Sequence, residues 1–189
     1  MSNFTTRPEI RGTFGVCAST HWLATATGMS ILEKGGNAFD AAVAMGFALQ
    51  VVEPHMNGPA GEVPVLFRKA GSNGIHVLSG IGTAPKKATP EAFHNLGLDR
   101  IPGTGLLPVV VPGAFDAWML LLRDYGTFRL HQVLEYAINF AKNGFAVAPT
   151  CAEAINLVSP FFQAEWQTSA ALYLRNGEPP KTGSLFRNP

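Results

Sequence analysis

Residues 35–54 constrain the fold of this chain more than any other stretch. Two adjacent glycines open it and permit a tight or left-handed turn out of the preceding segment. Asn37 is a favourable helix N-cap, and the carboxylate of Asp40 stands three residues later, where it can reach the free amides of a helix start. From residue 41 to residue 52 only Gln50 is polar, and a proline then ends the run. Because a helix that is apolar on nearly every side belongs inside a protein, the stretch predicts a buried helix over residues 38–52.

The remaining sequence predicts a mixture of helices and short strands. Apolar residues that recur every three or four positions indicate helices, and short apolar runs between glycines or prolines indicate strands. The predicted helices cover approximately residues 21–34, 38–52, 91–96, 114–125, 130–143 and 149–159, and the predicted strands cover residues 15–19, 63–69, 74–79 and 106–111. This order, with residues 63–69 and 74–79 joined as a hairpin, indicates an α+β fold in layers rather than a helical bundle.

The composition argues against a nucleic-acid or membrane partner. Charged residues make up 14% of the 189 residues and hydrophobic residues 47%, and the net charge is +1 with no basic or acidic block. Such a chain has no electrostatic attraction to nucleic acid or to an anionic bilayer. The apolar run over residues 41–52 is too short to span a membrane, and residues 1–12 form a polar, flexible arm without a signal-peptide core. We therefore expect a cytoplasmic protein.

At the C-terminus, residues 176–189 are rich in glycine, proline and lysine and show no compact ending.

The low share of charge has two explanations. Either much of the surface is covered by further chain or by another subunit, or the domain is simply compact and rich in small residues. The two cysteines, Cys17 and Cys151, have no metal-ligand spacing. Free buried thiols in a reducing compartment are the favoured state, and a disulfide between the two is the alternative.

The segment Ser19-Thr20-His21 places two hydroxyls beside an imidazole. A catalytic interpretation would make one hydroxyl a nucleophile and the imidazole its base. Neighbours in sequence rarely have the mutual geometry for proton transfer, and nothing nearby completes a relay. We therefore favour a junction between a strand and the following helix.

The polar residues after the buried helix have a similar double interpretation. Glu53 and His55 are candidates for a ligand or a metal, but their spacing fits no dedicated metal site, so we favour hydrogen bonds to loop backbone. The segment Asn57-Gly58-Pro59-Ala60-Gly61-Glu62 lacks the endings of a phosphate loop and of a dinucleotide fingerprint. It is interpreted as a tight turn into a strand.

Several ordered motifs, taken together, resemble a known family. They are Lys34-Gly35-Gly36-Asn37-Ala38, Asp40-Ala41-Ala42-Val43-Ala44, Val52-Glu53-Pro54-His55, Thr83-Ala84-Pro85, Val111-Pro112-Gly113, Tyr125-Gly126 and the run from Ala137 to Gly144-Phe145. Their order resembles the N-terminal part of the large subunit of gamma-glutamyltransferases, also called glutathione hydrolases, across roughly residues 15–189. The resemblance implies that residues 13–189 form an incomplete large-subunit domain of an αββα sandwich, the fold of N-terminal-nucleophile hydrolases.

The resemblance also implies the chemistry. In this family the precursor cleaves itself, and the new N-terminal threonine of the small subunit attacks the amide with its own α-amine as base. That threonine lies in a Thr-Thr-His-like motif, which is absent from these 189 residues. We therefore assign no catalytic residue, no metal ligand and no cofactor to this chain, leave its substrate-binding residues unassigned, and expect it to be inactive alone. The expected partners are the remainder of the precursor or the small subunit, and a small-molecule amide whose acyl group passes to water or an amine.

One position departs from the family pattern. An Arg-Glu pair usually precedes the segment that resembles Thr83-Ala84-Pro85, and its arginine binds the substrate's α-carboxylate; this chain has Ile81 and Gly82 there. An isoleucine cannot pair with a carboxylate, and Lys86, Lys87 and Arg68 are better explained as solvent-exposed residues than as substitutes. Two alternatives to a gamma-glutamyl-specific enzyme therefore stay open: a related acylase or amide hydrolase with another substrate, and a truncated, non-catalytic copy.

Overall fold

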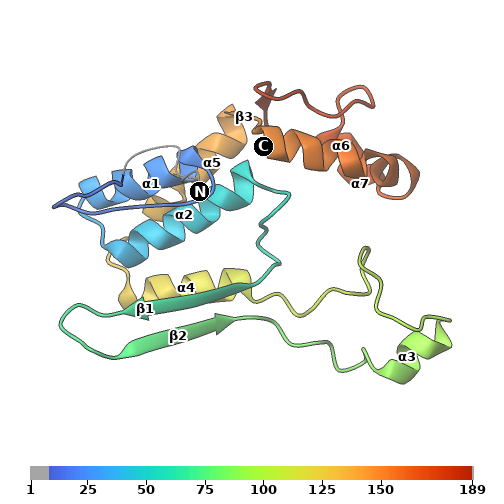
Figure 1. Ribbon diagram of the computed structural model, residues 1–189, viewed down its shortest axis with the longest axis horizontal. Coiled ribbons are helices and arrows are strands. Elements are labelled where there is room, and N and C mark those ends of the chain that lie inside the picture. Colours follow the sequence, from blue (N-terminus) through green and yellow to red (C-terminus); the bar gives the residue numbers. More distant parts are fainter. Residues whose placement is uncertain (1–8, 189) are drawn as a thin grey trace, which may run out of the picture.

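The computed structural model describes residues 9–188, in which seven helices and two small antiparallel sheets follow one another (Figure 1). The helices are Trp22–Glu33 (α1), Ala38–Val52 (α2), Pro90–Asn95 (α3), Ala114–Tyr125 (α4), Leu130–Asn143 (α5), Pro149–Ala164 (α6) and Gln167–Tyr173 (α7). The strands are Val63–Arg68 (β1), Ile75–Gly80 (β2), Phe145–Ala146 (β3) and Leu185–Phe186 (β4). The α+β class predicted from the sequence is confirmed, as are the six predicted helices and the hairpin.

The main core forms where α2 packs between its neighbours. In Figure 1, α1, α2 and α5 lie together, and the β1–β2 hairpin lies beside them with α4. The long predicted helix is indeed buried, since most of its apolar side chains are inaccessible to solvent. The buried members of this core are Ile31, Ala41, Val43, Ala44, Phe47, Leu121, Leu122, Val133 and Ala137. No helix among residues 9–188 combines the length and the apolar character needed to cross a membrane.

Asp40 joins the start of α2 to the loop between α4 and α5. Its carboxylate is fully buried, and one oxygen accepts the amide of Asn37 at 2.8 Å, which completes the predicted capping box. The amides of Thr127 and Phe128 donate to the other oxygen at 2.9 and 3.0 Å, and the Thr127 hydroxyl donates to the first at 2.7 Å. Four donors therefore satisfy a buried charge that has no cationic partner among the described residues.

A second core holds the C-terminal third of the described chain together. The helices α6 and α7 pack against the short β3–β4 ladder, in which Phe145 pairs with Phe186. The side chain of Phe186 is buried and stacks on Tyr173 with ring centroids 5.7 Å apart. The expectation that residues 176–189 have no compact ending is therefore wrong for the described part of that segment, because β4 carries an apolar anchor.

Two predicted strands are absent from the described residues. Residues 15–19 run without regular structure, because no neighbouring strand lies alongside to accept their backbone hydrogen bonds. Residues 106–111 contain Pro108, which lacks a backbone donor, and they make a single backbone bond to the 80–90 loop, from the amide of Val111 to the carbonyl of Thr83. The sequence analysis missed α7 and the β3–β4 ladder. Residues 1–8 of the predicted arm lie outside the described residues, and residues 9–12 have no regular structure.

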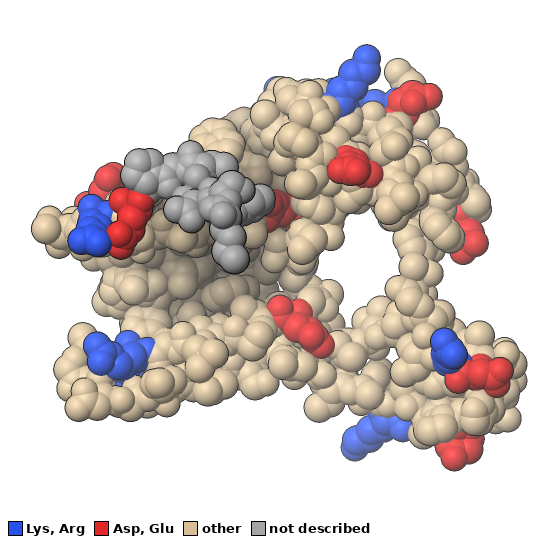
Figure 2. All heavy atoms as spheres, viewed as in Figure 1, with Lys and Arg blue, Asp and Glu red and all other residues tan. Residues whose placement is uncertain are grey.

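The hairpin presents a free apolar face. Inward-facing Val65 and Phe67 pack on the main core, whereas the alternate side chains on the other face are exposed, with Leu66, Ile75 and Val77 between 69% and 73% accessible. Figure 2 shows an open gap between the part that carries α6 and α7 and the part that carries α3, with charged side chains scattered over both parts. The described chain thus leaves uncovered an apolar surface of the kind that usually meets other protein.

Candidate functional site

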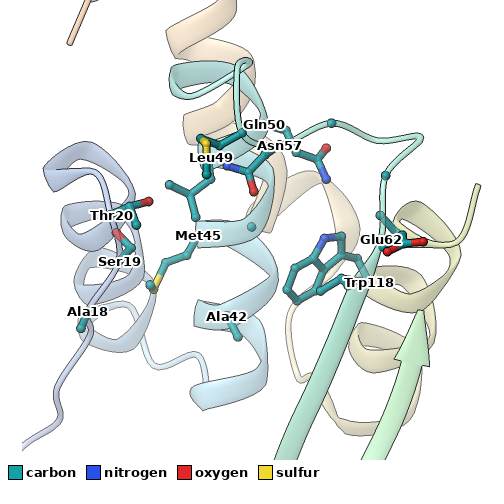
Figure 3. A pocket seen from close by; sticks show the side chains of 16 residues that line it. Ala18, Ser19, Thr20, Ala42, Met45, Leu49, Gln50, Asn57, Glu62 and Trp118 are labelled. Atoms are coloured by element: carbon teal, nitrogen blue, oxygen red, sulfur yellow. The ribbon is translucent and has the colours of Figure 1, made fainter. Parts of the chain in front are cut away.

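A groove of about 490 Å³ lies across the outer face of α2 (Figure 3). Its floor is formed by Ala42, Met45 and Leu49 of that helix. Residues 18–20 form one wall, and Trp118 of α4 with the start of β1 forms the other. The volume lies within the range of small-molecule sites in proteins.

The polar side chains of this groove are two hydroxyls, from Ser19 and Thr20, together with neutral amides and one carboxylate. Gln50 lies at the end of α2, and Asn57 and Glu62 come from the loop between α2 and β1. That loop is a turn closed by a bond from the Gly61 amide to the Gly58 carbonyl, and β1 begins directly after it, so the predicted tight turn into a strand is confirmed. Because no basic side chain lines the groove, it favours neutral or cationic ligands.

Trp118 is a wall residue that the sequence analysis did not single out. The α2–α4 contact places its ring so close to Gly46 that a Cβ at position 46 would lie 2.6 Å from the nearest ring atom. A glycine inside an otherwise regular apolar helix often marks such a close approach, and that signal was present in the sequence.

The segment at the start of α1 uses its three polar side chains in hydrogen bonds within the fold, and these residues are Ser19, Thr20 and His21. Ser19 Oγ donates to the carbonyl of His21 at 2.8 Å and lies 2.7 Å from Thr25 Oγ1. His21 is the N-cap of α1, and its Nδ1 accepts the amide of Leu23 at 3.2 Å. No hydrogen bond joins a hydroxyl of this segment to the imidazole among the described residues, so the nucleophile–base interpretation has no geometric support. The predicted strand-to-helix junction is confirmed for its helix half, and its strand half is wrong because residues 15–19 form no strand.

Glu53 and His55 differ from the prediction. The carboxylate of Glu53 accepts a hydrogen bond from the hydroxyl of Thr20, just before the start of α1, rather than from loop backbone. His55 Nδ1 is buried and has no partner in the described chain. The loop amides of Met56 and Asn57 instead donate to the backbone carbonyl of Glu53, so they do not need either side chain.

The charges of this region act on two neighbouring groups. Burial lowers the pKa of the His21 imidazole, and the charge of Glu53 opposes part of that shift. Burial is also the main reason why the pKa of the Cys151 thiol is raised, with Glu53 adding to the effect. Cys17 and Cys151 are both free thiols, so the disulfide alternative is not realised in this structure. Among residues 9–188 no three His, Cys, Asp or Glu side chains are placed to hold a metal ion.

Ile81 lies just beyond β2, and its side chain is 53% exposed. The chain on its C-terminal side is pinned against the segment before α4, since a Cβ at Gly82 would lie 1.6 Å from the carbonyl oxygen of Val111. Arg68, Lys86 and Lys87 are exposed, as expected for solvated side chains.

Comparison with known proteins gives a consistent result. The family model described as Gamma-glutamyltranspeptidase matches residues 24–189. The glutathione hydrolase-like YwrD proenzyme of Bacillus subtilis is 37% identical over 94% of this chain and 34% of its own length. The solved structure of LmbA2991HD is 55% identical over 99% of this chain and 32% of that chain, with a TM-score of 0.95. The cephalosporin acylase of Bacillus halodurans is 34% identical over 97% of this chain and 36% of that chain, with a TM-score of 0.84.

This chain therefore spans about a third of the length of these relatives. The match of the family model covers most of the chain and includes both cores described above. The motifs around α1 and α2, the hairpin and the α4–α5 pair all lie inside the matched residues. The chain belongs to the gamma-glutamyltranspeptidase family.

Proposed function

We propose that this chain is the N-terminal part of the large subunit of an acyl-transferring amidase. The proposal rests above all on one observation: nearly the whole chain matches about a third of a proenzyme. The enzyme would cleave a small-molecule amide and pass the acyl group to water or an amine, and the N-terminal threonine that attacks the amide would lie in the remainder of the precursor. The absence of a hydroxyl–imidazole pair in the described chain fits this division of labour.

The same proposal explains the free face of the hairpin. In an αββα sandwich, one face of each sheet packs on helices and the other face packs on the second sheet. The inner face of β1–β2 packs on the main core with α4, and its outer face exposes Leu66, Ile75 and Val77. We propose that a second sheet from the remainder of the precursor covers this outer face, and that residues 15–19 become a strand when a neighbouring strand is available.

The test is a comparison of two proteins made from the same gene. The protein expressed from its complete coding sequence is expected to release p-nitroaniline from gamma-glutamyl- or simple acyl-p-nitroanilides, and residues 1–189 alone are expected to release none. Turnover by residues 1–189, or the lack of an in-frame Thr-Thr-His-like segment in the coding sequence, would reject the enzyme and favour a non-catalytic copy. We also propose a reducing, cytoplasmic location, on the ground that both cysteines are free.

A non-gamma-glutamyl substrate is the second candidate, and Ile81 favours it. The side chain offers no charge to an α-carboxylate, and the nearby basic residues point to solvent. In the complete protein, Ile81→Arg is expected to raise kcat/KM for a gamma-glutamyl anilide by about tenfold or more, because a guanidinium–carboxylate pair contributes roughly 1.5–3 kcal/mol. An aliphatic acyl anilide without the carboxylate should gain nothing. Ile81→Leu is the matched control, and equal effects of the two substitutions on both substrates would count against this candidate.

A further inference from the structure

A second cleft, which shares Thr20 with the groove over α2, lies where the start of α1 meets the end of α2 and the start of α6. Its volume is about 460 Å³, and its lining includes Thr20, His21, Glu53, Thr150 and Thr182. Two of these side chains are almost completely buried: His21 is 4% exposed and Glu53 is 6% exposed. Because buried polar side chains in a cleft require hydrogen-bond partners, the contacts of His21 and Glu53 decide which atoms act as donors and which as acceptors.

The imidazole of His21 contributes a donor. Its Nδ1 accepts the amide of Leu23 and therefore carries no proton. Burial lowers the pKa of this group, which favours the neutral ring. The one proton of a neutral imidazole must then sit on Nε2, and Nε2 has no acceptor among residues 9–188.

The carboxylate of Glu53 contributes an acceptor. One oxygen is occupied by the hydroxyl of Thr20, and the other oxygen has no donor among the described residues. No lysine or arginine lines the cleft. This second oxygen is not among the buried atoms without a partner, so it keeps contact with solvent in the cleft, where a ligand N–H can replace water and form a charge-assisted hydrogen bond.

A neutral donor and an anionic acceptor in one cleft define a ligand chemistry. A primary carboxamide carries a carbonyl acceptor and an N–H donor on the same edge, so a single group can form hydrogen bonds with both side chains. A carboxylate ligand would be repelled by Glu53, and an ammonium ligand would leave the His21 donor without an acceptor. A trans peptide bond directs its N–H and C=O to opposite sides, so it meets one of the two groups at a time.

We propose that the cleft formed by His21, Glu53 and Thr20 binds a primary carboxamide, with the amide N–H donating to Glu53 and the amide oxygen accepting from His21 Nε2. Thr20 also lines the groove over α2, but His21 and Glu53 do not. Ligand binding at this site is measured without substrate turnover. A negative binding result can therefore be distinguished from a failure of the proposed amidase activity.

The test uses a set of ligands of one shape on the protein expressed from its complete coding sequence. Propionamide, propionate and propylammonium are titrated at neutral pH with ligand-observed NMR, together with the imidazole shifts of His21. Propionamide is expected to bind about tenfold or more tightly than either ion, since each misplaced donor or acceptor costs about 1–3 kcal/mol. Equal binding of the three, a preference for the ammonium, or no saturation by propionamide would overturn the proposal. N-methylacetamide, a trans amide, should bind weakly; tight binding would show instead that the cleft accepts peptide bonds of a neighbouring chain segment.

Two substitutions locate the site. Asparagine in His21→Asn keeps an acceptor for the helix cap but removes the Nε2 donor, and Glu53→Gln keeps an acceptor for Thr20 but replaces the free acceptor. Each is expected to weaken propionamide binding by about tenfold. His94→Asn, on the exposed side of α3, is the matched control and should bind as the parent does. Unchanged binding in the two cleft variants would place the ligand elsewhere; if either variant unfolds, the ligand series on the parent protein decides the question.

Discussion

Asp40→Ala is expected to lower the free energy of unfolding by about 4 kcal/mol, because it leaves buried amide donors without an acceptor. Three of the lost bonds come from backbone amides, of Asn37, Thr127 and Phe128, and the fourth comes from the Thr127 hydroxyl. These amides cannot turn to water, since the carboxylate that they surround is fully buried. A loss of this size approaches the whole stability of many domains, about 5–15 kcal/mol.

Urea denaturation of the two proteins measures this difference directly. The free energy of unfolding of Asp40→Asn should lie between those of the parent and the alanine variant. Its side-chain amide keeps one acceptor oxygen, but its NH2 group would face other hydrogen-bond donors. Asp99→Ala is the control, since Asp99 is exposed and forms no hydrogen bond within residues 9–188, and its effect should stay within about 0.5 kcal/mol. An Asp40→Ala loss as small as that of the control would show that the carboxylate does not hold α2 to the α4–α5 loop.

Val77→Asp is expected to change stability little in residues 1–189 alone and strongly in the protein from the complete coding sequence. In residues 1–189 alone the side chain is 69% exposed, so the substitution should change stability by no more than about 0.5 kcal/mol and should reduce binding of an apolar dye. In the protein from the complete coding sequence, a second sheet would bury the new charge without a partner. We expect a loss there of roughly 3–5 kcal/mol together with a fall in soluble yield.

Thermal unfolding and soluble yield of both proteins provide the comparison. Asn73→Asp adds the same charge at the exposed hairpin turn, where a second sheet would not reach it, and should be tolerated in both settings. If Val77→Asp is tolerated in the complete protein as well as Asn73→Asp is, then no sheet covers the outer face of the hairpin.

Local signals explain why so much of the fold was predictable. The start of α2 was correctly placed because Asn37 and Asp40 form a cap within one turn of helix, and caps depend on neighbours in sequence. The hairpin was equally local, since a short turn brings Arg68 opposite Ile75. In contrast, β3 and β4 are two-residue strands whose partners lie far apart in sequence, and no pattern of that length identifies a strand.

The site depended more on contacts between distant residues. The sequence placed a helix start at His21, and the structure makes His21 the N-cap of that helix. The bond from Thr20 to Glu53 crosses 33 positions of sequence and could not be predicted from either motif. Residues 15–19 have the composition of a strand but no strand partner among the described residues. Composition alone does not form a strand, because a strand needs the backbone hydrogen bonds of a neighbouring strand. The role of Trp118 became visible only when α4 was packed against Gly46.

Mapping the covalent acyl intermediate tests the central claim most directly. The protein from the complete coding sequence is reacted with an acyl-amide substrate, quenched in acid, digested and sequenced by mass spectrometry. The account predicts a labelled threonine at the N-terminus of a second, smaller chain, and no label on any residue from 1 to 189. An acyl group on Thr20, or on any other serine, threonine or cysteine of these 189 residues, would contradict it.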